Sequence, residues 1–152
     1  MDKIKEDKMG VGEICNREVV IVAPEESVLT ATRLMKNHSV GCLVVIKDER
    51  PVGILTDRDI AIRVVASSLN PEQTIVQEVM SSKLVKIRED QGIGDTIRLM
   101  RSASVRRIPV VSDKDDSLVG IITLDDLLDL IAEEMDELVK LIRRQQAQSF
   151  RV

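Results

Sequence analysis

Two short stretches of the chain hold residue types that could bind a ligand carrying hydroxyl or phosphate groups. Residues 53–59 are Gly-Ile-Leu-Thr-Asp-Arg-Asp, and residues 120–126 are Gly-Ile-Ile-Thr-Leu-Asp-Asp. In each, strand-forming residues lead into Thr-x-x-Asp, which is typical of the first turn of a helix. A strand that stops where a helix begins brings amide groups, a hydroxyl and a carboxylate together near the positive end of the helix dipole. We therefore expect a binding site at each junction.

The same pattern also has a purely structural interpretation. Thr-x-x-Asp approximates a capping box, in which the two side chains satisfy amide groups at the start of a helix and bind nothing else. Either motif taken alone favours this interpretation. The recurrence of the motif in the same strand-to-helix context favours a function, because a generic cap has no reason to recur within a long repeat.

The motifs belong to a repeat that spans most of the chain. Residues 33–35 (Arg-Leu-Met) recur at 98–100, an offset of 65 residues. Gly53 and Gly120 are 67 residues apart because the second unit has the longer hairpin turn. Each unit is expected to be strand, helix, strand, strand, helix. The expected strands are 19–22, 41–46, 51–56, 84–87, 108–111 and 117–123, and the expected helices are 27–37, 57–66 and 92–102, with a helical turn at 11–15.

These elements predict an α+β fold of two β-α-β-β-α units. We expect unit 1 over residues 11–70, unit 2 over 76–135, and a long terminal helix over 124–147 that continues from unit 2. A unit of about 60 residues can hardly bury both faces of a three-stranded sheet by itself. We therefore expect the units to pack sheet to sheet about a pseudo-twofold axis, with both motifs on the shared side.

The terminal helix is expected to carry more apolar surface than one unit can cover. Its apolar residues follow a heptad-like spacing. A second chain would cover this seam in a homodimer; the alternative is an intramolecular lid. The seam residues are Leu124, Leu128, Ile131, Met135, Leu138 and Ile142.

Composition excludes several classes of function. The chain of 152 residues has a formal net charge of −4 and no Trp or Tyr, which disfavours nucleic-acid binding by charge or by stacking. Cys15, Cys42 and the lone His38 cannot form a metal cluster, and no catalytic triad or phosphate-binding glycine loop is present. The charged start and the absence of a long apolar run predict a cytoplasmic protein without a membrane span. We therefore expect no catalytic residues, no metal and no enzyme.

The doubled unit, the two terminal motifs and Val-Arg-Arg-Ile-Pro-Val-Val at 105–111 together resemble cystathionine-β-synthase (CBS) domains in tandem, the pair called a Bateman module. The resemblance covers roughly residues 11–135. Residues 53–60 also look like the regulatory insert of inosine-monophosphate dehydrogenase, although no catalytic barrel accompanies them. The resemblance implies a regulatory module that binds an adenosine-containing ligand (AMP, ADP, ATP, S-adenosylmethionine or NAD) between its units and passes the change to an effector protein.

The resemblance also implies which residues bind, and it requires no cofactor besides this regulatory nucleotide. Asp59 and Asp126 would accept ribose hydroxyls, and Thr56 and Thr123 would contact ribose or phosphate. Strand ends and strand starts would line the pockets. These further ligand-binding residues are Ile21, Val22, Ala23, Cys42, Lys86, Ile87, Arg107, Ile108 and Pro109, with Arg58 beside the first motif.

The two sites are not expected to be equal. The cations expected near phosphates are Arg58, Lys86, Arg106 and Arg107; the alternative for each is a solvated surface charge. Asp125 beside Asp126 would repel phosphate at the second motif, which predicts a less charged ligand or none there. A dimerisation module with an unused cleft is the alternative function.

Overall fold

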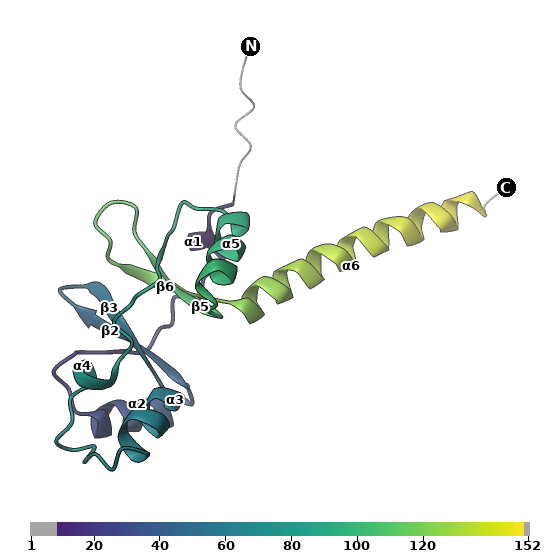
Figure 1. Cartoon of the computed structure of the whole chain (residues 1–152). Coiled ribbons are helices and arrows are strands. Elements are labelled where there is room, and N and C mark those ends of the chain that lie inside the picture. Colours follow the sequence, from purple (N-terminus) through teal and green to yellow (C-terminus); the bar gives the residue numbers. More distant parts are fainter. Residues whose placement is uncertain (1–8, 151–152) are drawn as a thin grey trace.

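The computed structural model describes residues 9–150 and shows two small lobes with one long helix that extends from the second (Figure 1). Two short helices, α1 (Val11–Ile14) and α4 (Val76–Val79), each precede one unit. The first unit contains β1 (Ile21–Val22), α2 (Val28–His38), β2 (Cys42–Lys47), β3 (Arg50–Thr56), α3 (Asp57–Ile60) and the π-helical turn η1 (Ala61–Val65). The second contains β4 (Ile87–Arg88), α5 (Ile93–Ala103), β5 (Arg107–Val111), β6 (Leu118–Thr123) and α6 (Leu124–Ser149).

Each unit forms a three-stranded sheet with the same topology. The strand orders are β1-β2-β3 and β4-β5-β6, with the first pair parallel and the second antiparallel in both sheets. The register is also repeated, because Thr56 lies opposite Cys42 and Thr123 lies opposite Arg107. The predicted fold class is confirmed. The first strand of each unit has only two residues and is shorter than predicted.

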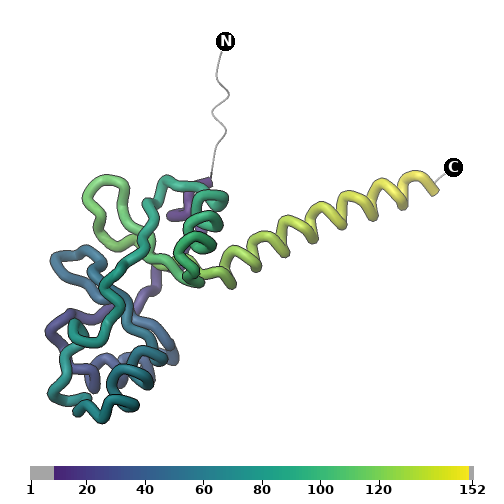
Figure 2. Tube along the Cα trace, in the orientation of Figure 1, coloured from purple at the N-terminus to yellow at the C-terminus, as the bar shows by residue number. Residues whose placement is uncertain are grey.

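The short helices are exchanged between the units. Val11 of α1 is buried in the core of the second unit, whereas Val76 and Val79 of α4 are buried in the core of the first. Figures 1 and 2 show α1, in purple, beside α5 of the second lobe before the chain crosses to the first. The residues that follow each short helix pair with the last strand of the unit on which that helix packs. After α1, Asn16 pairs with Ile121 of β6, and after α4, Ser81 pairs with Ile54 of β3.

This exchange gives the motif glycines a structural role. A Cβ atom on Gly120 would lie 2.6 Å from the carbonyl oxygen of Asn16, and one on Gly53 would lie 3.0 Å from that of Ser81. Real Cβ atoms essentially never come within 3.0 Å of another heavy atom. Each glycine therefore leaves room for the segment that crosses from the preceding helix.

The terminal helix α6 has 26 residues, which corresponds to about 39 Å. Its first turn packs on the second unit, where Leu127 is buried, but every residue from Ile131 to Ser149 is exposed. The helix therefore covers the core only at its start and is not folded back as a lid. Within residues 9–150, no helix combines the length and apolar character needed to cross a membrane.

Candidate functional site

Two hollows lie where the units meet, and each contains one motif threonine. The first, which we call the Thr123 hollow, has a volume of about 310 Å³, and the second, the Thr56 hollow, about 440 Å³. Both volumes lie within the usual range of small-molecule sites. The Thr123 hollow is lined by Asn16, Glu18, Val19, Val20, Val40, Gly41, Cys42, Val44, Asp57, Arg107, Ile121 and Thr123. The Thr56 hollow is lined by Ile54, Thr56, Arg58, Ser81, Lys83, Leu84, Val85, Ser104, Val105, Arg106 and Arg107.

Each hollow is built from both units. The Thr123 hollow takes its lead-in to β1 and the start of β2 from the first unit, but its threonine from the end of β6. The Thr56 hollow takes residues 83–85 and the start of β5 from the second unit, but its threonine from the end of β3. A molecule bound in either hollow would therefore contact both units.

Both motifs form complete capping boxes. The amide of Asp59 donates to Thr56 Oγ1 at 3.1 Å, and the amide of Thr56 donates to Asp59 Oδ2 at 3.0 Å. The corresponding distances for Asp126 and Thr123 are 3.2 and 2.9 Å. The structural interpretation of Thr-x-x-Asp therefore holds for both copies. It does not exclude ligand binding, because a carboxylate has further lone pairs and each Thr also lines a hollow.

The two aspartates of the motifs do not line either hollow. The second oxygen of Asp59, Oδ1, lies 3.4 Å from Arg63 of η1, and Arg63 also donates to the carbonyl of Val79 at 2.7 Å. Arg63 thus connects the first motif to the end of α4. Burial raises the pKa of the Cys15 thiol, and the negative charge of Asp126 is a further cause of this rise. Their proposed contact with ribose hydroxyls stays a prediction.

Cys42 and Arg107 meet in the wall of the Thr123 hollow. Burial raises the pKa of the Cys42 thiol, and Asp59 and Asp57 raise it further, whereas a hydrogen bond and the charge of Arg107 oppose this rise. This interaction joins the start of β2 in the first unit to the start of β5 in the second. Arg107 also lines both hollows. The raised pKa indicates a structural thiol rather than a nucleophile.

The other predicted residues are placed less uniformly. Arg58 lines the Thr56 hollow, and Ile21 lines an adjoining depression that shares Asn16 and Glu18 with the Thr123 hollow. Lys86 points elsewhere and pairs with Asp116 at 3.4 Å. Ala23 is exposed outside both hollows, and the remaining four side chains, Val22, Ile87, Ile108 and Pro109, are buried.

Sequence reasoning missed the segments that precede the first strand of each unit. Residues 18–20 line the Thr123 hollow, and residues 83–85, at the repeat offset of 65, line the Thr56 hollow. The offset itself could have identified them. Lys83 lines the Thr56 hollow and Lys86 does not. Among residues 9–150, no group of three or more His, Cys, Asp or Glu side chains could hold a metal ion.

Comparison with known proteins identifies the repeat. The family model of the CBS domain matches residues 11–66 and 76–133. The CBS domain-containing protein YhcV of Bacillus subtilis is 38% identical over 117 residues, which cover 77% of this chain and 81% of that protein. An uncharacterised protein of Methanopyrus kandleri is 33% identical over 121 residues, which cover 79% of this chain but only 61% of the relative.

Solved structures show the same fold. Hypoxic Response Protein I, determined with two coordinated zinc ions, is 31% identical with a TM-score of 0.71, covering 79% of this chain and 97% of that one. Two more distant structures contain ligands. The CBS domain pair of protein MJ0100, in complex with 5′-methylthioadenosine and S-adenosyl-L-methionine, is 23% identical with a TM-score of 0.71 over 84% of this chain and 98% of that one. A CBS domain protein from Pyrobaculum aerophilum complexed with AMP is 22% identical with a TM-score of 0.68 over 77% and 88%.

Proposed function

The chain belongs to the CBS-domain family, and on this premise we propose that it is a regulatory module that binds an adenosine-containing ligand between its two units. AMP, ADP, ATP, S-adenosylmethionine and NAD are the candidate ligands. The relatives solved with AMP and with S-adenosyl-L-methionine support this class of ligand. An effector protein would then read the change of state.

The observation that carries the proposal is the mixed origin of each hollow. A ligand can shift a conformational equilibrium only if it binds the two states with different affinity. Because Thr123 and residues 18–20 line one hollow from different units, any change in how the units sit together alters that hollow. The same holds for Thr56 and residues 83–85. Binding is therefore coupled to the arrangement of the units.

In this proposal each motif binds the sugar at the start of a helix. Asp59 and Asp126 do not line the hollows, so each would keep one oxygen on the helix cap and use the other to accept hydroxyls from a sugar that lies at the edge of the hollow. For Asp59 this requires Arg63, now 3.4 Å from Oδ1, to move or to share the carboxylate. The adenine would lie against the aliphatic walls, which include Val19 and Val20 in one hollow.

A thermal-shift screen with the five candidate ligands tests the proposal. A ligand that binds only the folded state, at 100 times its dissociation constant, stabilises that state by about 2.7 kcal/mol. Asp59→Ala and Asp126→Ala should reduce the ligand-induced shift. Both changes also remove a cap, so Ser27→Ala is the matched control, because it removes the α2 cap outside both hollows. An absence of any shift with all five ligands contradicts the proposal.

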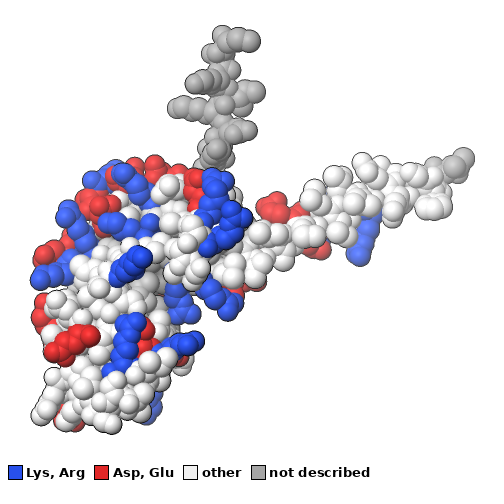
Figure 3. All heavy atoms as spheres, in the orientation of Figure 1, with Lys and Arg blue, Asp and Glu red and all other residues white. Residues whose placement is uncertain are grey.

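A second function, assembly through α6, is favoured by the apolar seam on its exposed part. On the face seen in Figure 3, uncharged side chains cover most of the outer part of the helix, with a few charged groups nearer its base. The exposed fractions are 54% for Leu128, 42% for Ile131, 60% for Met135 and 62% for Leu138. We propose a second copy of this chain as the partner, which would give a homodimer. Exposed apolar surface of this kind usually marks an interface.

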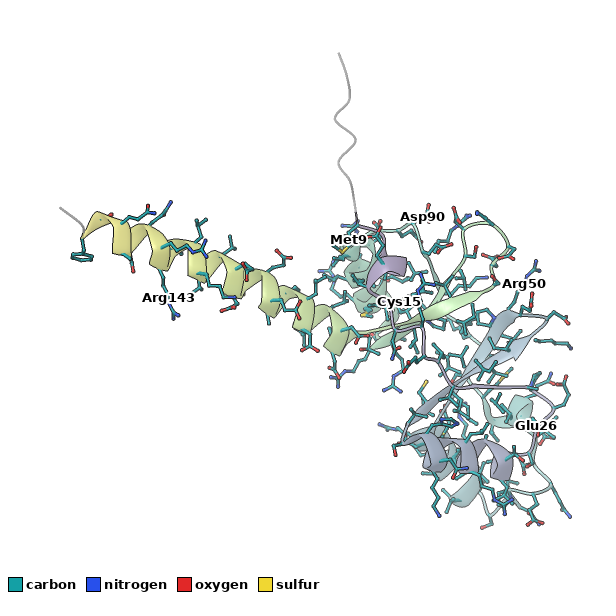
Figure 4. The ribbon with its side chains drawn as sticks, turned by 180° about the vertical axis from the view of Figure 1, so that it is seen from behind. Met9, Cys15, Glu26, Arg50, Asp90 and Arg143 are labelled. Carbon is teal, nitrogen blue, oxygen red and sulfur yellow. The ribbon has the colours of Figure 1, made fainter. Side chains whose placement is uncertain are left out.

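Charge along α6 favours an antiparallel pair. The helix is acidic up to residue 137 and basic after it, so an antiparallel partner places opposite charges side by side, whereas a parallel one places like charges together. Arg143 extends from the basic end (Figure 4). The acidic residues are Asp125, Asp126, Asp129, Glu133, Glu134, Asp136 and Glu137, and the basic ones are Lys140, Arg143 and Arg144.

Sedimentation velocity tests this assembly. Leu138→Asp places a charge in the seam and should yield monomers, whereas Ala147→Asp places the same charge outside the seam and should leave the dimer intact. Orientation is tested by mixing Leu128→Cys chains with size-tagged Ile142→Cys chains. Cross-links between the two variants indicate an antiparallel pair. A wild-type chain that sediments as a monomer at high concentration contradicts the assembly function.

A further inference from the structure

The two hollows differ in charge at repeat-equivalent positions. At an offset of 65 residues, Glu18 corresponds to Lys83, Gly41 to Arg106 and Cys42 to Arg107. The first member of each pair lines the Thr123 hollow and the second lines the Thr56 hollow. At the three equivalent positions, the second unit thus has a cation where the first has an acid, a glycine or a thiol.

The Thr56 hollow gathers four cations. Lys83, Arg106 and Arg107 come from the second unit, and Arg58 comes from α3 of the first. None of the described residues that line this hollow is acidic. Arg106 also lies 3.9 Å from Asp125, but both side chains are more than three-quarters exposed, so this pair holds the guanidinium only weakly.

The Thr123 hollow has the opposite balance. Glu18 and Asp57 line it, and Arg107, which is shared with the Thr56 hollow, is its one cation among the described lining residues. Asp57 lies close over Gly41, because a Cβ atom placed on that glycine would be 2.9 Å from Asp57 Oδ2. A second or third phosphate would meet these carboxylates in the Thr123 hollow.

We propose that the Thr56 hollow binds the phosphate chain of a nucleoside di- or triphosphate, and that the Thr123 hollow takes a nucleoside ligand without such a chain. The nucleoside part of this inference rests on the proposed function. Four cations with the hydroxyls of Thr56 and Ser104 supply charge-assisted hydrogen bonds to several phosphate oxygens. Asp125, which the sequence predicted would repel phosphate, does not line the Thr123 hollow. The carboxylates that line this hollow are those of Glu18 and Asp57.

Isothermal titration calorimetry of the full chain with adenosine, AMP, ADP, ATP and inorganic tripolyphosphate tests the proposal. Affinity should rise with the number of phosphates and fall with added salt for ATP but not for adenosine. Lys83→Ala should weaken ATP and tripolyphosphate about tenfold, since it removes a charge-assisted contact, and should leave adenosine unchanged. The matched control is Lys114→Ala, which removes the same charge from a loop that lines neither hollow.

The outcomes separate this inference from the proposed function. If ATP binds no more tightly than adenosine, or if Lys83→Ala and Lys114→Ala have equal effects, the phosphate assignment is wrong while nucleoside binding stands. If tripolyphosphate binds in a Lys83-dependent way but no nucleoside compound does, the anion hollow stands and the nucleotide-sensing function fails. Glu18→Gln removes one negative charge from the Thr123 hollow and should leave tripolyphosphate affinity unchanged. Tighter tripolyphosphate binding in that variant would place the phosphates in the Thr123 hollow and contradict the assignment.

Discussion

Gly120→Ala is expected to destabilise the chain more than a methyl group in a strand usually does. The new Cβ atom would lie 2.6 Å from the carbonyl oxygen of Asn16 and 2.7 Å from Cys15 Sγ. Favourable contacts between non-bonded heavy atoms begin at about 3.5 Å. The segment that contains Cys15 and Asn16 must therefore move by most of an ångström, away from β6.

The size of the effect follows from what that movement breaks. Asn16 and Ile121 exchange two backbone hydrogen bonds, both 2.9 Å long, and each such bond contributes about 1 kcal/mol. Overpacking adds about 1–3 kcal/mol. We expect a loss of about 3 kcal/mol in the free energy of unfolding, or roughly 6–12 °C in Tm for a chain of this size.

Two other glycines calibrate this expectation. Gly53→Ala should cost less, because its closest neighbour is Met80 Sδ at 2.6 Å, the flexible part of a side chain, and the backbone oxygen of Ser81 is 3.0 Å away. Gly94→Ala should stabilise the chain by about 0.5–1 kcal/mol, because it lies within α5 with nothing nearer than 3.6 Å.

The assay is urea denaturation followed by far-ultraviolet circular dichroism, because the chain has no Trp or Tyr to report by fluorescence. An unfolding free energy for Gly120→Ala within about 0.5 kcal/mol of wild type would refute the reasoning, since surface changes alone reach that size. A larger loss for Gly53→Ala than for Gly120→Ala would refute it as well.

Three further predictions can be checked in the same assay. Glu49→Gly should raise the free energy of unfolding by up to about 1 kcal/mol, because Glu49 has a φ of 64° in the β2–β3 turn, where glycine is not strained. Asp126→Asn should lower it by about 1 kcal/mol, because the carboxylate caps the positive end of α6. Burial raises the pKa of both Cys15 and Cys42, so the unfolded thiols ionise first as the pH rises. Stability from these thiols is present below the ordinary thiol pKa of about 8.5 and lost above it, and a Cys15→Ser, Cys42→Ser chain should lose less stability than wild type between pH 7 and 10.

Sequence patterns predicted the elements of this fold well because the repeat supplied each of them twice. The helix expected over 27–37 is α2, Val28–His38, and the one expected over 92–102 is α5, Ile93–Ala103. Ser39 and Ser104, which occupy equivalent places after these helices, share a φ of 54°. Helix bounds and the left-handed residue after each helix depend on local sequence, so two copies of the same pattern in the repeat are enough to locate them.

The site was harder to predict because it depends on the exchange between units. Nothing local indicates that residues 11–14 pack on the second unit, so the sequence did not show which strand segments lie beside each threonine. Lys86 was predicted because it lies near the end of the strand expected over 84–87, whereas β4 begins at Ile87 and Lys83, three residues before Lys86, lines the Thr56 hollow. The residues before a two-residue strand are free of the ladder, and they line the hollow instead.

The position of Thr123 connects the proposed ligand site to the proposed assembly surface. Its hydroxyl accepts from the amide of Asp126 at 3.2 Å and so begins α6, and the same residue lines the Thr123 hollow. A ligand that accepts a hydrogen bond from this hydroxyl would change the strength of the hydrogen bond between Thr123 and the Asp126 amide, which caps the first turn of the helix. Because Leu127 holds that turn in the core and the seam continues from Leu128, a change at the cap would act directly on the base of the helix that we propose pairs in the dimer. Ligand binding and α6 pairing are therefore expected to be linked, and by reciprocity a variant locked as a monomer should bind its ligand with altered affinity.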